Sequence, residues 1–241
     1  MTRTYPPSSP RPIVITPGYL ARHPASVLYA SGETQVLCAA TMTREVPAFL
    51  DGKGRGWATA EYSLLPASTQ PRARRERSGK ISGRTQEIQR LIGRSIRGVL
   101  DLEALDGWTI HVDCDVLQAD GGTRTASING AFVAVELAVH DAMERDLLER
   151  SPVEQAVGAM SAGMVAGEAL LDLNYEEDSS ADVDLNLVLA GESSIIEIQG
   201  TAEGRPLSRG QLDELVELAS SGIHQVFKRQ KEAVAAAKGS G

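Results

Sequence analysis

A double glycine followed by hydroxyl and arginine side chains is the most informative chemical feature of the sequence. The run Gly121-Gly122-Thr123-Arg124 lies where an alternating, strand-like pattern gives way to a helical one. Glycine lets a backbone approach a ligand closely, and the first N–H groups of a helix point toward an anion. These residues could therefore bind phosphate. The alternative is a tight glycine turn in which Thr123 caps the helix.

A second helix start could bring another cation to the same anion. Ser82 or Thr85 can cap a helix that begins near Gly83, and Arg84 lies in its first turn. Guanidinium groups bind phosphate oxygens in a bidentate manner, so Arg84 would add a donor if the two helix starts face each other. Taken alone, an arginine at a helix start is simply exposed.

Carboxylates gather in the second half of the chain. Asp182, Asp184 and Asn186 alternate with apolar residues, which places all three on one face of a strand, and Asp178 lies in an acidic loop just before it. Oxygen ligands grouped in this way suit Mg²⁺, or one carboxyl can act as a general acid while its neighbours keep its pKa raised. A solvent-facing acidic edge strand is the competing explanation.

Charge is strongly segregated along a chain whose formal net charge is −8. Residues 68–97 hold nine basic residues against two acidic ones, whereas residues 141–184 hold twelve acidic residues against two basic ones. The stretch 66–82 has no hydrophobic periodicity, which predicts an exposed loop. Four arginines lie in this loop: Arg72, Arg74, Arg75 and Arg77. A basic surface that faces an acidic one would suit phosphate and metal binding, although two unrelated solvated faces would give the same composition.

The elements that must position these groups follow from hydrophobic periodicity. Strands are expected at residues 12–16, 26–31, 35–43, 57–65, 109–118, 155–165, 169–174, 182–190 and 194–199. Helices are expected at residues 83–102, 123–150 and 208–231. Two strand-rich sheets that each carry helices predict an α+β or mixed α/β architecture.

The composition is that of an ordinary globular protein of 241 residues, 42% of them hydrophobic and only 4% aromatic. So few aromatic residues argue against a platform that stacks RNA bases. Cys38 and Cys114 fall in strand-like alternations, which predicts reduced core thiols in a cytosolic protein. The sequence has neither an apolar run of about 18 residues nor a secretory signal, so we expect a cytoplasmic protein without a membrane partner. Motifs of P-loop nucleotide-binding proteins and of serine hydrolases are missing.

Six stretches in a fixed order make the chain resemble the ribonuclease PH family from about Arg11 to Gln230. They are GWATAEY at 56–62, SGRTQEIQRLIGR at 82–94, DCDVLQADGGTRTAS at 113–127, YEEDS at 175–179, VDLN at 183–186 and EIQGTAEG at 197–204. The resemblance implies the ribonuclease PH fold, an α+β (mixed α/β) fold like ribosomal protein S5 domain 2, with two βα-rich halves packed as one domain over residues 11–231. We expect a disordered Pro/Ser-rich segment at residues 1–10 and a flexible tail at residues 232–241.

By the same resemblance, the chain is expected to be a phosphate-dependent 3′→5′ exoribonuclease. Such enzymes trim tRNA precursors and other structured RNA 3′ ends, release nucleoside 5′-diphosphates reversibly and assemble as a homo-hexamer, a trimer of dimers. The implied phosphate site consists of Arg84, Gly122, Thr123 and Arg124. Asp178 and Asp184 are the implied catalytic and Mg²⁺-binding pair, with Asp178 favoured as proton donor, Asp184 as metal ligand and Asp182 as a weaker candidate. The arginine loop, defined by Arg72, Arg74, Arg75 and Arg77, resembles the loop with which the family contacts RNA.

The sequence differs from the usual family pattern at two places, and two alternative functions remain to be compared with this interpretation. Family members usually carry Asp-Gly-Arg just before the Arg-Pro that here is Arg11-Pro12, and Asn129 stands where threonine is common. Neither change touches the implied catalytic set. A catalytically silent ring subunit that binds RNA would share the fold, but such subunits commonly lose the phosphate arginine or the acidic pair. A hydrolytic, metal-dependent nuclease would use water in place of phosphate.

Overall fold

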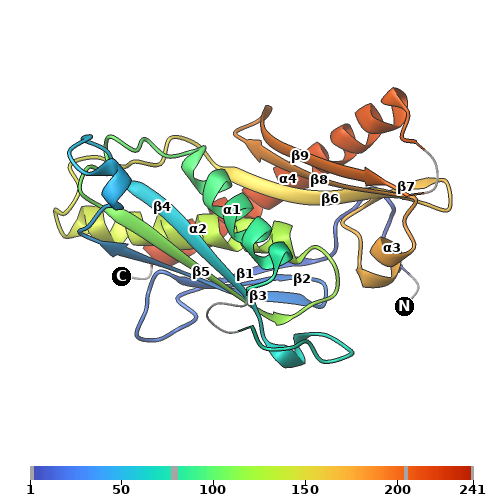
Figure 1. Cartoon of the computed structure of the whole chain (residues 1–241), viewed down its shortest axis with the longest axis horizontal. Coiled ribbons are helices and arrows are strands. Elements are labelled where there is room, and N and C mark those ends of the chain that lie inside the picture. The colour runs from blue at the N-terminus through green and yellow to red at the C-terminus, as the bar shows by residue number, and fades with distance from the viewer. Residues whose placement is uncertain (1–2, 77–80, 204–205, 240–241) are drawn as a thin grey trace.

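Two β-sheets, each covered by helices, make up the protein, and the prediction of a mixed α/β fold is confirmed (Figure 1). The computed structural model describes residues 3–76, 81–203 and 206–239. Among these residues, the first sheet has five strands in the order β1-β2-β3-β5-β4, namely β1 (Ile13–Pro17), β2 (Ser26–Ser31), β3 (Thr34–Thr43), β4 (Trp57–Leu64) and β5 (Thr109–Gln118). The strand β4 runs parallel to β5, and the other neighbours in this sheet are antiparallel.

The second sheet is antiparallel throughout and has the order β7-β6-β8-β9. Its strands are β6 (Val157–Val165), β7 (Glu168–Leu171), β8 (Val183–Ala190) and β9 (Ser194–Ala202). The helices are α1 (Gly83–Arg97), α2 (Thr123–Glu144), α3 (Tyr175–Ser179) and α4 (Arg209–Lys238), and two short 3-10 helices span Ala48–Leu50 and Pro66–Ser68. The short α3 hangs below the end of this sheet in Figure 1.

The core forms where the apolar faces of the sheets meet their helices. In β5, Ile110, Val112, Cys114 and Val116 are buried while the residues between them are more exposed, as strand alternation requires. The helix α2 packs on β3 of the first sheet and on β6 of the second, which explains why apolar residues surround it on nearly all sides. Because α2 begins directly after the Gly121-Gly122 turn, this central helix positions that turn between the two sheets.

The two cysteines confirm one prediction about the core. Cys38 and Cys114 lie directly opposite each other on β3 and β5, and both are buried and unpaired by disulfide. The hydrogen bond with Cys38 and, after it, burial raise the pKa of the Cys114 thiol above its ordinary value. Both thiols therefore behave as small apolar core groups.

Several element boundaries differ from the sequence-based expectations. Residues 175–179, expected to be a loop, form α3, because Asn174 caps the segment and makes a capping box with Glu177. The helix α2 ends at Glu144, short of the expected residue 150, and α4 continues to Lys238, so residues 232–238 are helical instead of a flexible tail.

The N-terminal segment also makes contacts that its composition did not predict. The Arg3 guanidinium lies 3.0 Å from the Glu177 carboxylate, and the Pro7 carbonyl accepts a hydrogen bond from the Leu171 amide. Residues 3–10, expected to be disordered, thus lie along β7 and α3.

Candidate functional site

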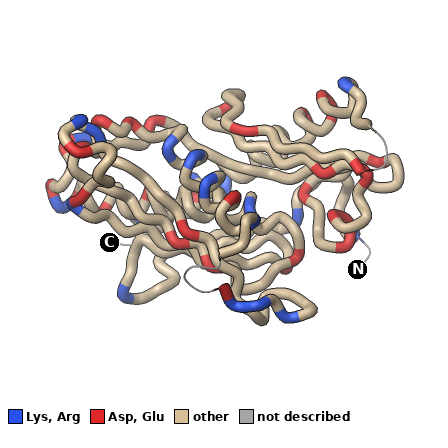
Figure 2. The backbone as a smooth tube through the Cα atoms, viewed as in Figure 1, with Lys and Arg blue, Asp and Glu red and all other residues tan. Residues whose placement is uncertain are grey.

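The six residues predicted to bind phosphate or catalyse the reaction line one cavity of about 820 Å³ between the two halves of the chain. They are Arg84, Gly122, Thr123, Arg124, Asp178 and Asp184. The first four come from the starts of α1 and α2, and the two aspartates come from α3 and β8. Figure 2 shows the same division, with basic residues along α1 and acidic residues around α3. The structure therefore brings together groups that lie up to 100 positions apart in the sequence.

The anion turn, defined here as residues 120–122, is shaped by two left-handed glycines. Gly121 has φ 74° and Gly122 has φ 62°, a region that side chains other than glycine rarely adopt. A Cβ atom on Gly121 would lie 2.4 Å from the Leu173 carbonyl oxygen, so packing requires glycine there as well. Glycine is thus needed at this turn for both its conformation and its size.

The start of α2 offers backbone N–H groups to the cavity. Gly122 is the N-cap residue, and no side chain caps the helix, so the first-turn donors are available to an anionic ligand. The alternative in which Thr123 caps α2 is wrong, because Thr123 is the first helical residue and its hydroxyl lies 2.9 Å from the Tyr62 hydroxyl. This contact with buried Tyr62 fixes Thr123 on the cavity wall.

Arg84 reaches the cavity from the first turn of α1. Ser82 caps this helix by accepting a hydrogen bond from the Thr85 amide at 3.2 Å. Of the two expected cap residues, Ser82 and Thr85, the structure therefore has Ser82. The first turns of α1 and α2 therefore each contribute an arginine to the same cavity, and α2 contributes its N-terminal residues as well. Arg84 thus lies at the cavity that the start of α2 lines, as the sequence-based expectation required.

Two neighbours that sequence reasoning missed hold Arg124. Its Nη1 atom donates hydrogen bonds to the Glu87 carboxylate at 3.4 Å and to the Gln199 side-chain oxygen. Gln199 in turn donates to Glu87 at 3.3 Å, which closes a three-membered network across α1, α2 and β9. Glu87 and Gln199 both lie in stretches that resemble the ribonuclease PH family, but no local pattern in the sequence predicts that they contact Arg124.

The acidic wall of the cavity consists of Asp178, Asp184 and Asn186. Burial and the nearby Asp178 raise the pKa of Asp184 to about 6, while Arg124 opposes the shift. The pKa of Asp178 is also raised by burial, and Arg124, Arg84 and Arg11 act in the opposite direction. The Asn186 amide donates to both Asp184 oxygens at 3.4 Å. One carboxyl of the pair can therefore hold a proton near neutral pH.

The same donor set is compatible with a hard divalent cation. Mg²⁺ in nucleotide-processing sites is typically bound by one or two carboxylates, and waters and substrate phosphates complete its shell. Asp178 and Asp184 supply that number, and the described residues contain no group of three or more acidic, histidine or cysteine side chains that would make an all-protein cage. The chemistry of the wall thus fits a cation that is shared with substrate.

Asp182 differs from its two neighbours on β8. It is exposed and precedes the strand, whereas Asp184 and Asn186 line the cavity. The expectation that all three share the functional face therefore holds only for Asp184 and Asn186.

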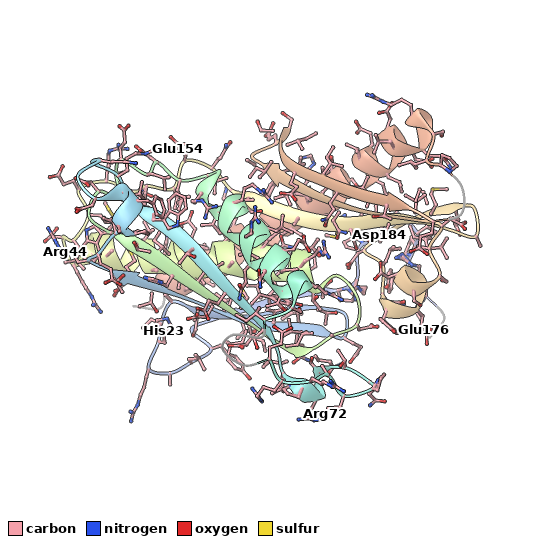
Figure 3. All side chains as sticks on the ribbon, viewed as in Figure 1. His23, Arg44, Arg72, Glu154, Glu176 and Asp184 are labelled. Carbon is pink, nitrogen blue, oxygen red and sulfur yellow. The ribbon has the colours of Figure 1, made fainter. Side chains whose placement is uncertain are left out.

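The arginine loop begins at the rim of the cavity and continues away from it. Residues 69–71 line the cavity, and Arg72, Arg74 and Arg75 follow them with exposed side chains. Figure 3 labels Arg72 on this loop and Asp184 on the second sheet. Arg77, the fourth predicted RNA contact, lies outside the described residues.

Two protein-family models match the chain. The model of the 3′ exoribonuclease family, domain 1, matches residues 9–139, and the model of domain 2 of that family matches residues 155–222. A ribonuclease PH from Syntrophomonas wolfei is 55% identical over 222 residues, which is 92% of this chain and 93% of that protein. A ribonuclease PH from Neisseria meningitidis is 54% identical over 228 residues, 94% of each chain.

Solved structures with low sequence identity share the fold. The rice (Oryza sativa) Rrp46 structure superposes with a TM-score of 0.78 at 17% identity and covers 96% of this chain and 98% of its own. A subunit of the Archaeoglobus fulgidus exosome with RNA bound to the active site also gives 0.78, at 24% identity, over 92% of this chain and 89% of its own.

Proposed function

The chain belongs to the 3′ exoribonuclease family, as one of its ribonuclease PH enzymes, and we propose that the cavity between its two halves is the site of phosphorolysis. The protein is a phosphate-dependent 3′→5′ exoribonuclease that processes tRNA. The observation that carries the site assignment is that two arginines and a helix N-terminus line the same cavity as two carboxylates with raised pKa values.

Phosphate binds at the start of α2 in this proposal. The N–H groups that follow Gly122, the Thr123 hydroxyl and the guanidinium groups of Arg84 and Arg124 supply the donors. A phosphate oxygen attacks the last phosphodiester in line with the leaving 3′-oxygen, and the arginines stabilise the charge that develops on the transferred group. The products are a nucleoside 5′-diphosphate and an RNA shortened by one residue. Because a phosphodiester is exchanged for a phosphoanhydride, the reaction is reversible.

The leaving 3′-oxygen needs a proton, and the acidic wall supplies it. Asp178 is the donor in our assignment, and Asp184 is the ligand for Mg²⁺, while Asn186 orients the Asp184 carboxylate. When bound, the cation would neutralise charge on the transferring phosphoryl group. The raised pKa of both carboxyls supports a role for this pair in proton transfer.

RNA enters past the arginine loop. Arg72, Arg74 and Arg75 are exposed just beyond the cavity rim, where they can contact phosphates without reading bases. Arg77 extends this set in the sequence. The loop thus holds the strand whose 3′ end lies in the cavity, and tRNA precursors with other structured RNA 3′ ends are the proposed substrates.

Assembly and location complete the proposal. A homo-hexameric ring, a trimer of dimers, is the proposed oligomer, and the similarity in fold to exosome subunits is in keeping with a ring. The cytoplasm is the proposed compartment. No helix among the described residues is long and apolar enough to cross a membrane.

A silent RNA-binding ring subunit is the second candidate function. The fold shared with Rrp46 is the observation in its favour. The retained Arg84, Arg124, Asp178 and Asp184, all on one cavity, favour an active enzyme.

Separate titrations of phosphate and Mg²⁺ test the assignment of residues. Degradation of a tRNA with a 3′ extension is followed in the wild type, Arg124→Ala and Asp184→Asn. We expect Arg124→Ala to raise the phosphate KM and Asp184→Asn to raise the Mg²⁺ concentration for half-maximal rate. Equal effects of both variants on both titrations would contradict the division of roles.

A further inference from the structure

A buried ion pair lies next to the anion turn. The Arg11 guanidinium contacts the Asp172 carboxylate at 2.6 Å, and each of the two side chains is 3% exposed. The residues are 161 positions apart, one before β1 and the other just after β7. Neither is among the residues that line the cavity, so neither touches substrate in the proposed reaction.

The Asp172 carboxylate accepts several hydrogen bonds in addition to its ion pair with Arg11. Its Oδ2 atom accepts hydrogen bonds from the Arg11 amide and Nε atoms, both at 3.0 Å, and from the Ser31 hydroxyl at 2.9 Å. Its backbone adopts φ 55°, which is uncommon for a residue with a side chain. The bonds to Arg11 and Ser31 therefore keep Asp172 in one orientation, and removal of either charge would leave the other buried without a partner.

The Arg11 guanidinium contacts the anion turn through Asp120. Arg11 Nη1 donates a hydrogen bond to the Asp120 carbonyl and lies 3.9 Å from the Asp120 carboxylate. A Cβ atom on Gly122 would lie 3.0 Å from Arg11 Nη2. Because Gly122 caps α2, the guanidinium directly supports the backbone that would bind phosphate.

The carboxylate connects the same turn to α3. Asp172 is separated from the α3 N-cap, Asn174, by a single residue. The Tyr175 amide, the first in α3, donates to the Asp120 carboxylate at 3.2 Å. The anion turn and the start of α3 are therefore in contact, and Arg11 bonds both to Asp120 in the turn and to Asp172, three residues before α3.

We propose that Arg11 and Asp172 are positioning residues for phosphorolysis, which hold the anion turn in register with the helix that carries Asp178. The pair would fix the separation between bound phosphate and the carboxyl that protonates the leaving oxygen. This inference rests on the proposed assignment of the anion turn and Asp178. A displacement of about 1 Å at a reacting group can reduce a rate on the order of 100-fold, so such a support has kinetic value beyond stability.

A double variant separates positioning from stability. Arg11→Met with Asp172→Leu replaces the ion pair by apolar side chains, an exchange that often leaves stability unchanged or improved. Leu105→Ala is the matched control, because Leu105 is fully buried and lies near the opposite end of β5 from the anion turn. Thermal unfolding, phosphate KM, RNA KM and kcat are measured for each variant and for the wild type.

We expect the double variant to raise the phosphate KM about tenfold or more and to lower kcat, with the RNA KM within about twofold of wild type. Leu105→Ala should lose thermal stability and keep its phosphate KM. Ser31→Ala, which removes one donor to Asp172 and keeps both charges, should raise the phosphate KM about threefold, so the test does not depend on the double variant alone.

A phosphate KM at the wild-type value in both the double variant and Ser31→Ala would overturn the positioning role. Wild-type saturation by phosphate is a separate measurement of the proposed function. If the wild type saturates with phosphate and the variants have the same phosphate KM, the positioning role is refuted and the proposed phosphorolysis stands.

Discussion

The two walls of the cavity present their charges in different ways. On the basic wall, Arg84 and Arg124 sit in the first turns of α1 and α2, where backbone geometry already favours an anion. On the acidic wall, Asp178 and Asp184 come from a single-turn helix and a strand, and each is partly buried. The basic wall is built from local motifs, whereas the raised pKa values on the acidic wall arise from burial in the folded chain and, for Asp184, from the nearby Asp178.

The largest loss of activity should follow a substitution on the basic wall. Arg124→Ala removes a proposed donor to the transferring phosphate, and we expect kcat/KM for phosphate to fall on the order of 100-fold to 1,000-fold. The fold should survive, because Arg124 lies at the cavity and its side-chain nitrogens bond to Glu87 and Gln199 at the cavity wall. Arg145→Ala is the control, since Arg145 is exposed and pairs with Asp141 on the surface. Wild-type rates of Arg124→Ala at subsaturating phosphate would refute the assignment.

On the acidic wall, Asp184→Asn should reduce kcat about 100-fold because it removes a carboxyl from the pair proposed to transfer the proton and bind Mg²⁺. Asp182→Asn, two positions earlier and exposed, is the matched control and should stay within about twofold of wild type. Single-turnover rates at saturating phosphate provide the comparison. Equal losses in both variants would mean that the charge of this segment matters and the position of Asp184 does not.

The raised pKa of Asp184 also predicts a pH dependence of stability. Its folded value of about 6 lies above the ordinary value of 3.8, so the folded state binds the proton more tightly than the unfolded state. The free energy of unfolding should therefore fall as pH rises from about 4 to about 6, by about 2 kcal/mol after allowance for partial solvent contact.

Denaturant titrations without Mg²⁺ measure this slope. Asp184→Asn, which cannot titrate, should flatten it. A slope of the same size in Asp184→Asn would assign the effect to another group.

The smallest effect on chemistry should come from the arginine loop. Replacement of Arg72, Arg74, Arg75 and Arg77 by alanine should weaken tRNA binding and flatten its dependence on salt, since fewer counterions are released. The kcat at saturating RNA should change by less than about twofold, because the described members of this set are exposed beyond the cavity rim. Filter binding at several salt concentrations measures the slope. Unchanged affinity would show that the loop is a solvated charge run.

The sequence predicted most of what depends on local pattern. Alternation in β5 and the glycines at 121 and 122 predicted the strand and the glycine turn after it correctly, and the start of α1 followed from Ser82 and the helical period. The family resemblance then selected six residues that all line the same cavity. These features are encoded within short windows, where periodicity and capping chemistry act.

What the sequence did not predict depends on contacts between distant segments. Glu87 and Gln199 are 112 positions apart, and Arg11 and Asp172 are 161 apart, so no local pattern connects either pair. The α3 helix was missed because its capping box occupies a segment too short for hydrophobic periodicity. The direction of the Asp184 shift likewise depends on burial and on Asp178, both of which require the folded chain.

The most direct measurement is an analysis of products from a tRNA with a 3′ extension, incubated with Mg²⁺ in the presence and absence of inorganic phosphate. Phosphorolysis predicts shortening from the 3′ end and nucleoside 5′-diphosphates that form only when phosphate is present. Nucleoside monophosphates that form without phosphate would show that water is the nucleophile, and would contradict the roles given to Arg84, Arg124 and the anion turn.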